Sequence, residues 1–230
     1  MAAKVTKQVK KTKSPKVSIT RDSIMSMYMT YVLEHGARPK SIYKFAKDNN
    51  IEESDFYGFF GSFEGLREQV WVSFYDNTLN VLEKDKGYMS YPNKEKMLSF
   101  YFTFFEVLTA NRSYVLFTLC ESENEMKNMK QLSALRKRVK QFAGDLIEQG
   151  NEQKNFRLIK NPVGLFSEGA WVQLLFLIKY WMKDNSAGFE KTDIAIEKSV
   201  KAVFDVFETT PLESVLDLGK FLFKERFSKA

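Results

Sequence analysis

Few residues of the types that catalyse reactions occur in this sequence, and their spacing predicts no active site. The single histidine, His35, stands at the predicted end of a helix, where a histidine often interacts with free carbonyl groups. The single cysteine, Cys120, could pair with it, but its apolar stretch SYVLFTLC favours an inert thiol. Glu106, Glu168 and Lys179 occur in apolar helical stretches, where charges can mark a site but more often face solvent or pair with each other.

Metal and cofactor sites have as little support in the sequence. One histidine and one cysteine exclude a His-rich metal site and a thiolate cluster, and neither a Walker-type nor a dinucleotide-binding glycine pattern occurs. We therefore expect no enzymatic activity and no cofactor. A single cysteine also excludes an intramolecular disulfide, which favours the cytoplasm. The charge-free run at residues 169–178 is shorter than the roughly 20 residues of a bilayer span, so we expect no transmembrane segment.

Residues 41–60 have the pattern of a helix-turn-helix, in which a supporting helix, a tight turn and a second helix lock together through apolar side chains. Asn49 or Asn50 can take the left-handed conformation that the turn demands. The apolar residues that can pack across the turn are Ile42, Phe45, Ala46, Ile51, Phe56 and Phe60. Taken alone, this pattern predicts only a short helical hairpin.

The longer string SIYKFAKDNNIEESDFYGFFGSFEGL, residues 41–66, resembles the DNA-binding segment of TetR-family transcriptional regulators. The matching positions are Ala46, Ile51, Phe56, Tyr57, Phe60, Ser62, Glu64 and Leu66. The resemblance implies an all-α, TetR-like fold, with an N-terminal three-helix helix-turn-helix domain followed by a larger helical bundle domain. We accordingly expect a disordered basic tail at residues 1–16, the helix-turn-helix domain at 17–66, and a ligand-binding and dimerisation domain at 67–230.

The second helix of this motif departs from the family pattern where it should contact DNA. Positions that usually hold serine, threonine, lysine or another small or basic residue are here Glu52, Glu53, Asp55, Gly58 and Phe63. Only Tyr57 keeps its usual type, for which the resemblance implies a phosphate contact. Carboxylates at the groove face weaken binding because duplex affinity comes largely from neutralising phosphates, although they can accept hydrogen bonds from cytosine amino groups.

The net charge of +6 comes from the N-terminal tail. Residues 1–16 contain six lysines and no acid, and subtracting these six from 35 basic residues leaves 29 against 29 acidic residues. Such an arm can solubilise the protein, lie on an anionic membrane, or reach the phosphates of DNA. The residues that we expect to contact DNA are Lys10, Lys11, Lys13, Lys16, Lys40, Lys44 and Tyr57.

Apolar periodicity predicts helices along the whole chain, and all five prolines fall between the periodic segments. The longest predicted helices cover residues 20–35, 62–83, 123–149, 163–184 and 189–208. A further helix, which Asn93 can cap, is apolar on nearly all sides and should be central. A last, amphipathic helix after Pro211 could cover the core of its own subunit or lie on a membrane surface.

The TetR-like resemblance implies an apolar ligand cavity within the larger domain and a four-helix bundle formed by residues 163–208 of two copies. The expected cavity residues are Phe100, Phe104, Leu108, Trp171 and Leu175. The expected dimer residues are Trp171, Leu174, Ile178, Ile196, Val200 and Val203. The simpler interpretation of both sets is that they fill the core of one subunit.

Together these observations predict a cytoplasmic, homodimeric TetR-like regulator that binds duplex DNA and is controlled by an apolar small molecule or lipid. The alternative is a lipid- or hydrophobic-metabolite-binding protein whose helix-turn-helix no longer contacts DNA, with peripheral membrane contact through its last helix. The acids at residues 52–55 favour the alternative, and the lysine arm favours the regulator.

Overall fold

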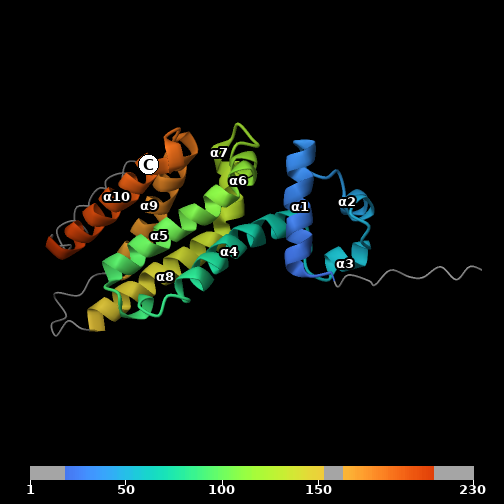
Figure 1. Ribbon diagram of the computed structural model, residues 1–230. Coiled ribbons are helices and arrows are strands. Elements are labelled where there is room, and N and C mark those ends of the chain that lie inside the picture. Colours follow the sequence, from blue (N-terminus) through green and yellow to red (C-terminus); the bar gives the residue numbers. More distant parts are fainter. Residues whose placement is uncertain (1–18, 153–162, 210–230) are drawn as a thin grey trace, which may run out of the picture. The chain divides into compact units, whose positions relative to one another are not determined.

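The computed structural model describes residues 19–152 and 163–209, and every regular element in these ranges is helical (Figure 1). The all-α fold expected from the sequence is therefore confirmed. The chain divides into two compact units, Met1–Ser62 and Phe63–Ala230. The lysine arm and the helix predicted after Pro211 lie outside the described residues.

Three helices form the first unit: α1 (Arg21–His35), α2 (Ile42–Asp48) and α3 (Glu53–Tyr57). Helix α1 begins with a capping box, in which the Thr20 hydroxyl accepts from the Ser23 backbone N–H at 3.1 Å and the Ser23 hydroxyl accepts from the Thr20 N–H at 2.9 Å. It ends at Gly36, whose φ of 59° glycine adopts without steric cost. His35 Nδ1 lies 2.9 Å from the carbonyl oxygen of Tyr31, so this histidine has the expected structural role at a helix end.

The core of this unit is a row of aromatic rings that joins all three helices. The ring of Phe45 lies 6.3 Å from that of Tyr28 and 6.0 Å from that of Phe56, whose ring in turn lies 5.9 Å from Phe60. All four side chains are buried. The turn between α2 and α3 is made by Asn50, which takes the predicted left-handed conformation with φ of 54°. Aromatic packing and one left-handed residue thus set the helix-turn-helix geometry.

Seven helices form the described part of the second unit: α4 (Phe63–Leu82), α5 (Asn93–Ala110), α6 (Arg112–Leu119), α7 (Glu125–Met129), α8 (Ser133–Glu152), α9 (Val163–Lys183) and α10 (Glu190–Thr209). Helix α5 packs against α4, α8 and α10, and α9 packs against α8 and α10 (Figure 1). The α5 hydroxyl of Tyr101 donates to the carbonyl oxygen of Ala170 on α9 at 3.0 Å. As its apolar circumference predicted, α5 is central. None of the described helices is both long and apolar enough to span a bilayer.

The prediction of a single helix over residues 123–149 is wrong, because the helical conformation is interrupted within this range. Helix α7 ends at Met129, a 3₁₀ turn covers Lys130–Leu132, and α8 begins at Ser133. The side chains of Asn128 and Gln131 are buried and bind backbone groups at the end of α6. Tertiary hydrogen bonds to a neighbouring helix therefore override the local helical pattern at this point.

A charged clamp holds the turn between α9 and α10. The Asp184 carboxylate accepts hydrogen bonds from the backbone N–H and hydroxyl groups of both Ser186 and Thr192, at 2.6–2.9 Å. The Arg112 guanidinium donates to the carbonyl oxygens of Trp181 and Met182 at 3.1 and 3.2 Å. The same group lies 4.3 Å from the ring centroid of Trp181, which adds a cation–π contact. These contacts fix the angle at which α9 and α10 leave the turn.

Replacing Asp184 with asparagine should destabilise the second unit in a pH-dependent manner. Burial alone raises the pKa of Asp184, but the hydrogen bonds from Ser186 and Thr192 outweigh burial and hold that pKa well below its usual range. The ionised carboxylate therefore stabilises the fold above the unfolded-state pKa of about 3.9, and the contribution is lost as pH falls from there towards the folded-state pKa.

Urea unfolding followed by tryptophan fluorescence measures this effect, because Trp71, Trp171 and Trp181 all lie in the second unit. At pH 7 the midpoint of unfolding should occur at a higher urea concentration for the wild type than for Asp184→Asn. This gap between the two midpoints should narrow below about pH 4. Asp76→Asn, at an exposed position of α4, is the matched control. A gap that stays constant at all pH values would contradict the assignment.

Candidate functional site

The residues predicted to contact DNA are exposed on the first unit where the structure describes them. Lys40 precedes α2, and Tyr57, at the end of α3, is 54% exposed. Lys44 is exposed as well, but its ammonium lies 2.6 Å from the Asp48 carboxylate, whose hydrogen bond and charge raise the pKa of Lys44. Lys10, Lys11, Lys13 and Lys16 lie outside the described residues. Between positions 19 and 62, five basic residues stand against six acidic ones, so this part of the unit has no basic surplus.

The acids at the start of α3 have a local structural role. The Asp55 carboxylate accepts a hydrogen bond from the backbone N–H of Glu52 at 2.9 Å, which closes the first turn of the helix. Carboxylates there also interact favourably with the helix dipole. A helix of only five residues depends on such contacts, since short helices are marginal in water. Acids that favour the helix are thus the same acids that oppose a phosphate backbone.

The predicted cavity residues on α5 fill the core of the second unit. Phe100, Phe104 and Leu108 are fully buried. The ring of Phe100 stacks on Phe104 at 5.7 Å and lies 4.6 Å from the ring of Phe142. Trp171 is also buried, and of the five predicted residues only Leu175 lines a cavity described below. The α5 face is therefore packed against aromatic rings of α5 and α8.

A groove of about 760 Å³ lies between α6, α7 and α9, and we call it the α6–α9 groove. This volume is within the range of about 300–1,000 Å³ that is usual for small-molecule sites. Its apolar lining is Leu116, Leu119, Met129, Val172, Leu175, Phe176, Ile178 and Met182. Cys120, at the end of α6, is exposed and also lines the groove. The second unit thus has an apolar recess, but at a different place from the predicted one.

Charged residues of opposite sign stand on opposite walls of the α6–α9 groove. Lys179 and Lys183 come from α9, whereas Glu125 begins α7 and Glu123 lies in the connection just before it. The Lys179 ammonium lies 3.4 Å from the Glu125 carboxylate, with side chains that are 62% and 80% exposed. An ion pair this exposed contributes at most about 1 kcal/mol. Of the other charges noted in the sequence, Glu168 pairs with Arg136 and Lys140, and Glu106 is exposed.

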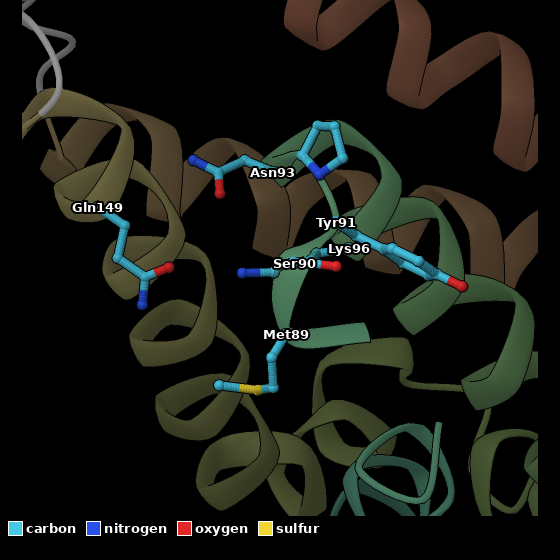
Figure 2. A pocket seen from close by; sticks show the side chains of 7 residues that line it. Met89, Ser90, Tyr91, Asn93, Lys96 and Gln149 are labelled. Carbon is cyan, nitrogen blue, oxygen red and sulfur yellow. The ribbon is translucent and has the colours of Figure 1, made fainter. Parts of the chain in front are cut away.

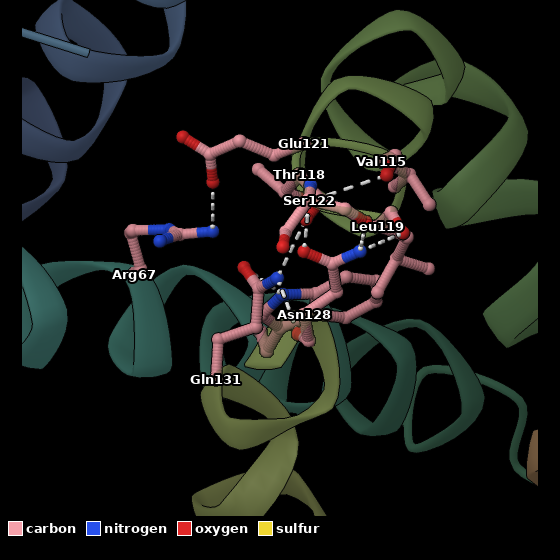
Figure 3. A network of polar contacts seen from close by, with 9 residues as sticks. Arg67, Val115, Thr118, Leu119, Glu121, Ser122, Asn128 and Gln131 are labelled. Carbon is pink, nitrogen blue, oxygen red and sulfur yellow. Dashed lines mark hydrogen bonds and ion pairs between the residues drawn. The ribbon is translucent and has the colours of Figure 1, made fainter. Parts of the chain in front are cut away.

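A buried polar network lies beside this groove, which its members Ser122 and Asn128 also line (Figure 3). The Asn128 amide donates to the carbonyl oxygens of Leu119 and Ser122 at 2.8 and 2.7 Å. The Gln131 amide donates to the carbonyl oxygen of Thr118 at 3.0 Å, and its oxygen accepts from the Trp71 indole N–H at 3.1 Å. Nothing in the sequence marked Asn128 and Gln131, because on an amphipathic helix they resemble surface residues. The network fixes the end of α6 against α4 and α7.

The predicted dimer residues lie mainly inside one subunit. Val203 is half-buried. The other five are buried: Trp171, Leu174, Ile178, Ile196 and Val200. The opposite side of α9 carries exposed apolar residues at intervals of seven, four and four: Leu165, Val172, Phe176 and Tyr180. We call these four residues, together with Ile194 of α10, the α9–α10 face. A hollow of about 400 Å³ on this face is lined by Phe176, Tyr180 and Ile194 among others.

The sequence signal for this face was the apolar run GAWVQLLFLIKYWM, which covers more than one side of α9. Residues four apart lie on one side of a helix, so the run contains two apolar stripes. Choosing between them requires the position of α5 and α8, which bury the stripe that contains Leu174. The dimer residues chosen from sequence belong to the buried stripe.

Another cavity, of about 750 Å³, lies beside the start of α5 and the last turn of α8 (Figure 2). Its lining includes Ser90, Asn93, Lys96 and Gln149 and is more polar than that of the α6–α9 groove. Since the residues that follow Glu152, the last residue of α8, lie outside the described ranges, we assign no role to this cavity.

Comparison with known proteins gives one family match. A family model described as tetracyclin repressor-like, C-terminal domain, matches residues 96–222, which is more than half of the chain. This segment contains most of α5, all of α6 to α10, and every lining residue of the α6–α9 groove. None of the curated proteins that were compared matches the chain.

Replacing Gln131 with leucine should lower the free energy of unfolding by about 2–3 kcal/mol, because the Trp71 N–H and two carbonyl oxygens lose their buried partner. The same change should cost less in a Trp71→Phe background, where the donor is already absent. Urea unfolding of the four variants in the cycle measures the difference. Gln149→Leu, at an exposed position of α8, should change stability by less than about 0.5 kcal/mol. Equal costs in both backgrounds would refute the proposed coupling.

Proposed function

Since the chain belongs to the tetracyclin repressor-like (TetR) family, we propose that it is a homodimeric transcriptional regulator that binds DNA and responds to an apolar small molecule. The first unit contacts DNA in this proposal. The second unit forms the dimer and holds the ligand.

The observation that carries the DNA-binding part is the helix-turn-helix geometry of α2 and α3. Asn50 makes the tight turn, and the rings of Phe45 and Phe56 lock the two helices at 6.0 Å. Tyr57 projects from the end of α3 with 54% of its surface exposed, in keeping with a phosphate contact. The lysine arm precedes α1 directly in sequence and supplies the positive charge that the described part of this unit lacks.

The α9–α10 face supports the homodimer. Phe176 is 54% exposed, Val172 62%, and Ile194 49%, on two helices that lie side by side. Burying a large apolar side chain contributes about 1.5–3 kcal/mol, so a few such residues on two copies provide a substantial driving force. In a dimer of this kind, α9 and α10 of both copies form a four-helix bundle. The two DNA-binding units are then held at a spacing that must match half-sites about 34–36 Å apart. A ligand regulates DNA binding only if it prefers one spacing over another.

A second candidate function is favoured by the acids of α3. Glu52, Glu53 and Asp55 stand where phosphate contacts are expected, and Asp55 already caps the helix. In this alternative the protein binds a lipid or hydrophobic metabolite through its second unit, and the helix-turn-helix is retained only as a fold element.

Selection of random duplex DNA distinguishes the two functions. Residues 17–230 and the intact chain should both enrich the same inverted repeat at physiological salt, with the intact chain binding more tightly because six lysines are added. Omitting the tail prevents non-specific phosphate binding from being mistaken for sequence selectivity. Failure of both proteins to enrich any sequence, while folded and dimeric, would mean that the helix-turn-helix is only a fold element, and a copurifying lipid would then favour the second function.

The dimer is tested by Ile194→Glu, which places a carboxylate in the middle of the α9–α10 face. We expect the dimer dissociation constant to increase at least tenfold, about 1.4 kcal/mol or more, because two carboxylates must leave water at the interface and the nearby Lys191 and Lys198 offset only part of that cost. Analytical ultracentrifugation measures this change. Val81→Glu is the matched control, since Val81 on α4 is 44% exposed and Ile194 is 49% exposed. An Ile194→Glu protein as dimeric as the control would place the interface elsewhere.

A further inference from the structure

We propose that the α6–α9 groove binds a single-chain amphiphile with an anionic head group, and that a second copy of the chain closes the open side of this groove. The inference rests on the proposed function, for which it names the class of ligand and its coupling to the dimer.

The walls of the groove suit a flexible hydrocarbon chain. Leu116 and Leu119 of α6 face Leu175 and Ile178 of α9 across a volume of about 760 Å³. Met129 and Met182 also line it, and methionine side chains adapt to ligands without a fixed shape. A chain of methylene groups makes use of this surface along its whole length.

The head group is assigned from the exposed ion pair at the rim. Lys179 holds Glu125 at only 3.4 Å, and Glu125 lies in the first turn of α7, where the helix dipole favours a carboxylate even without Lys179. An anionic ligand that takes Lys179 therefore leaves Glu125 in a favourable place. A cationic ligand that took Glu125 would instead leave Lys179, whose side chain is 62% exposed, facing solvent without its partner. Lys183, one turn further on the same wall, has no ion pair among the described residues and is a second cation for the head group.

The open side of the groove is shared with the α9–α10 face. Val172 and Phe176 line the groove, yet they are 62% and 54% exposed, so they form its outer edge. Phe176 also lines the hollow beside Ile194 and is therefore the ridge between the two. A second copy that covers the α9–α10 face must pack on this ridge. The second copy then adds a wall to the groove beside Phe176, which forms the outer edge of the groove in one subunit.

A shared wall links ligand binding to dimerisation. A ligand that contacts both copies binds the dimer more tightly than the monomer, and by thermodynamic reciprocity it strengthens the dimer by the same factor. The amphiphile thus acts on the four-helix bundle itself, which sets the spacing of the DNA-binding units in the proposed regulator.

Cys120 provides a local reporter for the test, because it is the only cysteine of the chain and lines the groove. The rate of its alkylation by iodoacetamide is measured on the full-length dimer with dodecanoate, dodecan-1-ol and dodecyltrimethylammonium, each below its micelle-forming concentration. Dodecanoate should slow alkylation saturably. Dodecan-1-ol should slow alkylation to the same extent only at a concentration about tenfold higher, because it lacks the charge that pairs with Lys179.

Two variants separate the head group from the shared wall. Lys179→Gln should weaken the binding of dodecanoate about tenfold and leave the binding of dodecan-1-ol unchanged. Lys137→Gln, on the exposed side of α8, should change the binding of neither ligand. Ile194→Glu lies outside the groove lining, so it should weaken dodecanoate only through loss of the dimer. Sedimentation should also show dodecanoate lowering the dimer dissociation constant of the wild type.

The proposal fails if dodecyltrimethylammonium protects Cys120 as well as dodecanoate, or if Ile194→Glu is monomeric and binds dodecanoate as tightly as the wild type. It also fails if Cys120 is unreactive in the ligand-free dimer but reactive in that monomer, because the second copy then fills the groove. Absence of protection in a dimer that selects a DNA sequence overturns this inference and leaves the proposed function intact. Protection by dodecanoate without DNA selection supports the inference and overturns only the DNA-binding function.

Discussion

Helix α9 has more apolar surface than one copy of the chain buries. Both candidate binding surfaces of the second unit depend on this excess. One side of α9 buries Leu174, Leu177 and Trp181 against its own subunit. The other side leaves Val172 and Phe176 exposed to water. Because apolar surface in water is unfavourable by roughly 25 cal/mol per Å², this second stripe favours association, either with another protein surface or with an apolar ligand. The α6–α9 groove and the α9–α10 face are the two places where that association can occur, and Phe176 belongs to both.

Polar contacts hold two segments next to α9 in place, the turn into α10 and the end of α6. Asp184 and Arg112 hold the turn into α10 through charge-assisted hydrogen bonds, which are stronger than neutral ones. Asn128 and Gln131 donate to backbone carbonyl oxygens at the end of α6, and Asn128 also lines the groove. Buried polar groups of this kind cost stability when they lose a partner, so they permit one packing arrangement and oppose others. The end of α6, which forms one wall of the groove, is therefore held in place, and Val172 and Phe176 form the exposed outer edge.

The first unit shows a conflict between local helix stability and DNA affinity. A five-residue α3 gains from acids in its first turn, and Asp55 closes that turn by accepting from the Glu52 N–H. The same negative charge opposes a phosphate backbone, whose neutralisation supplies most of the affinity of DNA-binding proteins. In the proposed regulator the two needs are divided between segments. The lysine arm supplies charge without sequence preference, Tyr57 contacts a phosphate, and the carboxylates of the helix supply selectivity.

The sequence was enough to predict the all-α fold, four of the five longest helices to within one or two residues, a helix-turn-helix with a left-handed asparagine at its turn, and the resemblance to the family. These features depend on local periodicity, on caps and on turn residues, which act over a few positions of the chain. Only the tertiary structure decided that Phe100 and Phe104 fill the core, that Asn128 and Gln131 interrupt a helix, and that Phe176 rather than Leu174 faces outward. Periodicity gives the side of a helix on which apolar residues lie, but α9 has two such sides. Which of them is buried depends on where α5 and α8 pack, and those contacts join residues far apart in sequence.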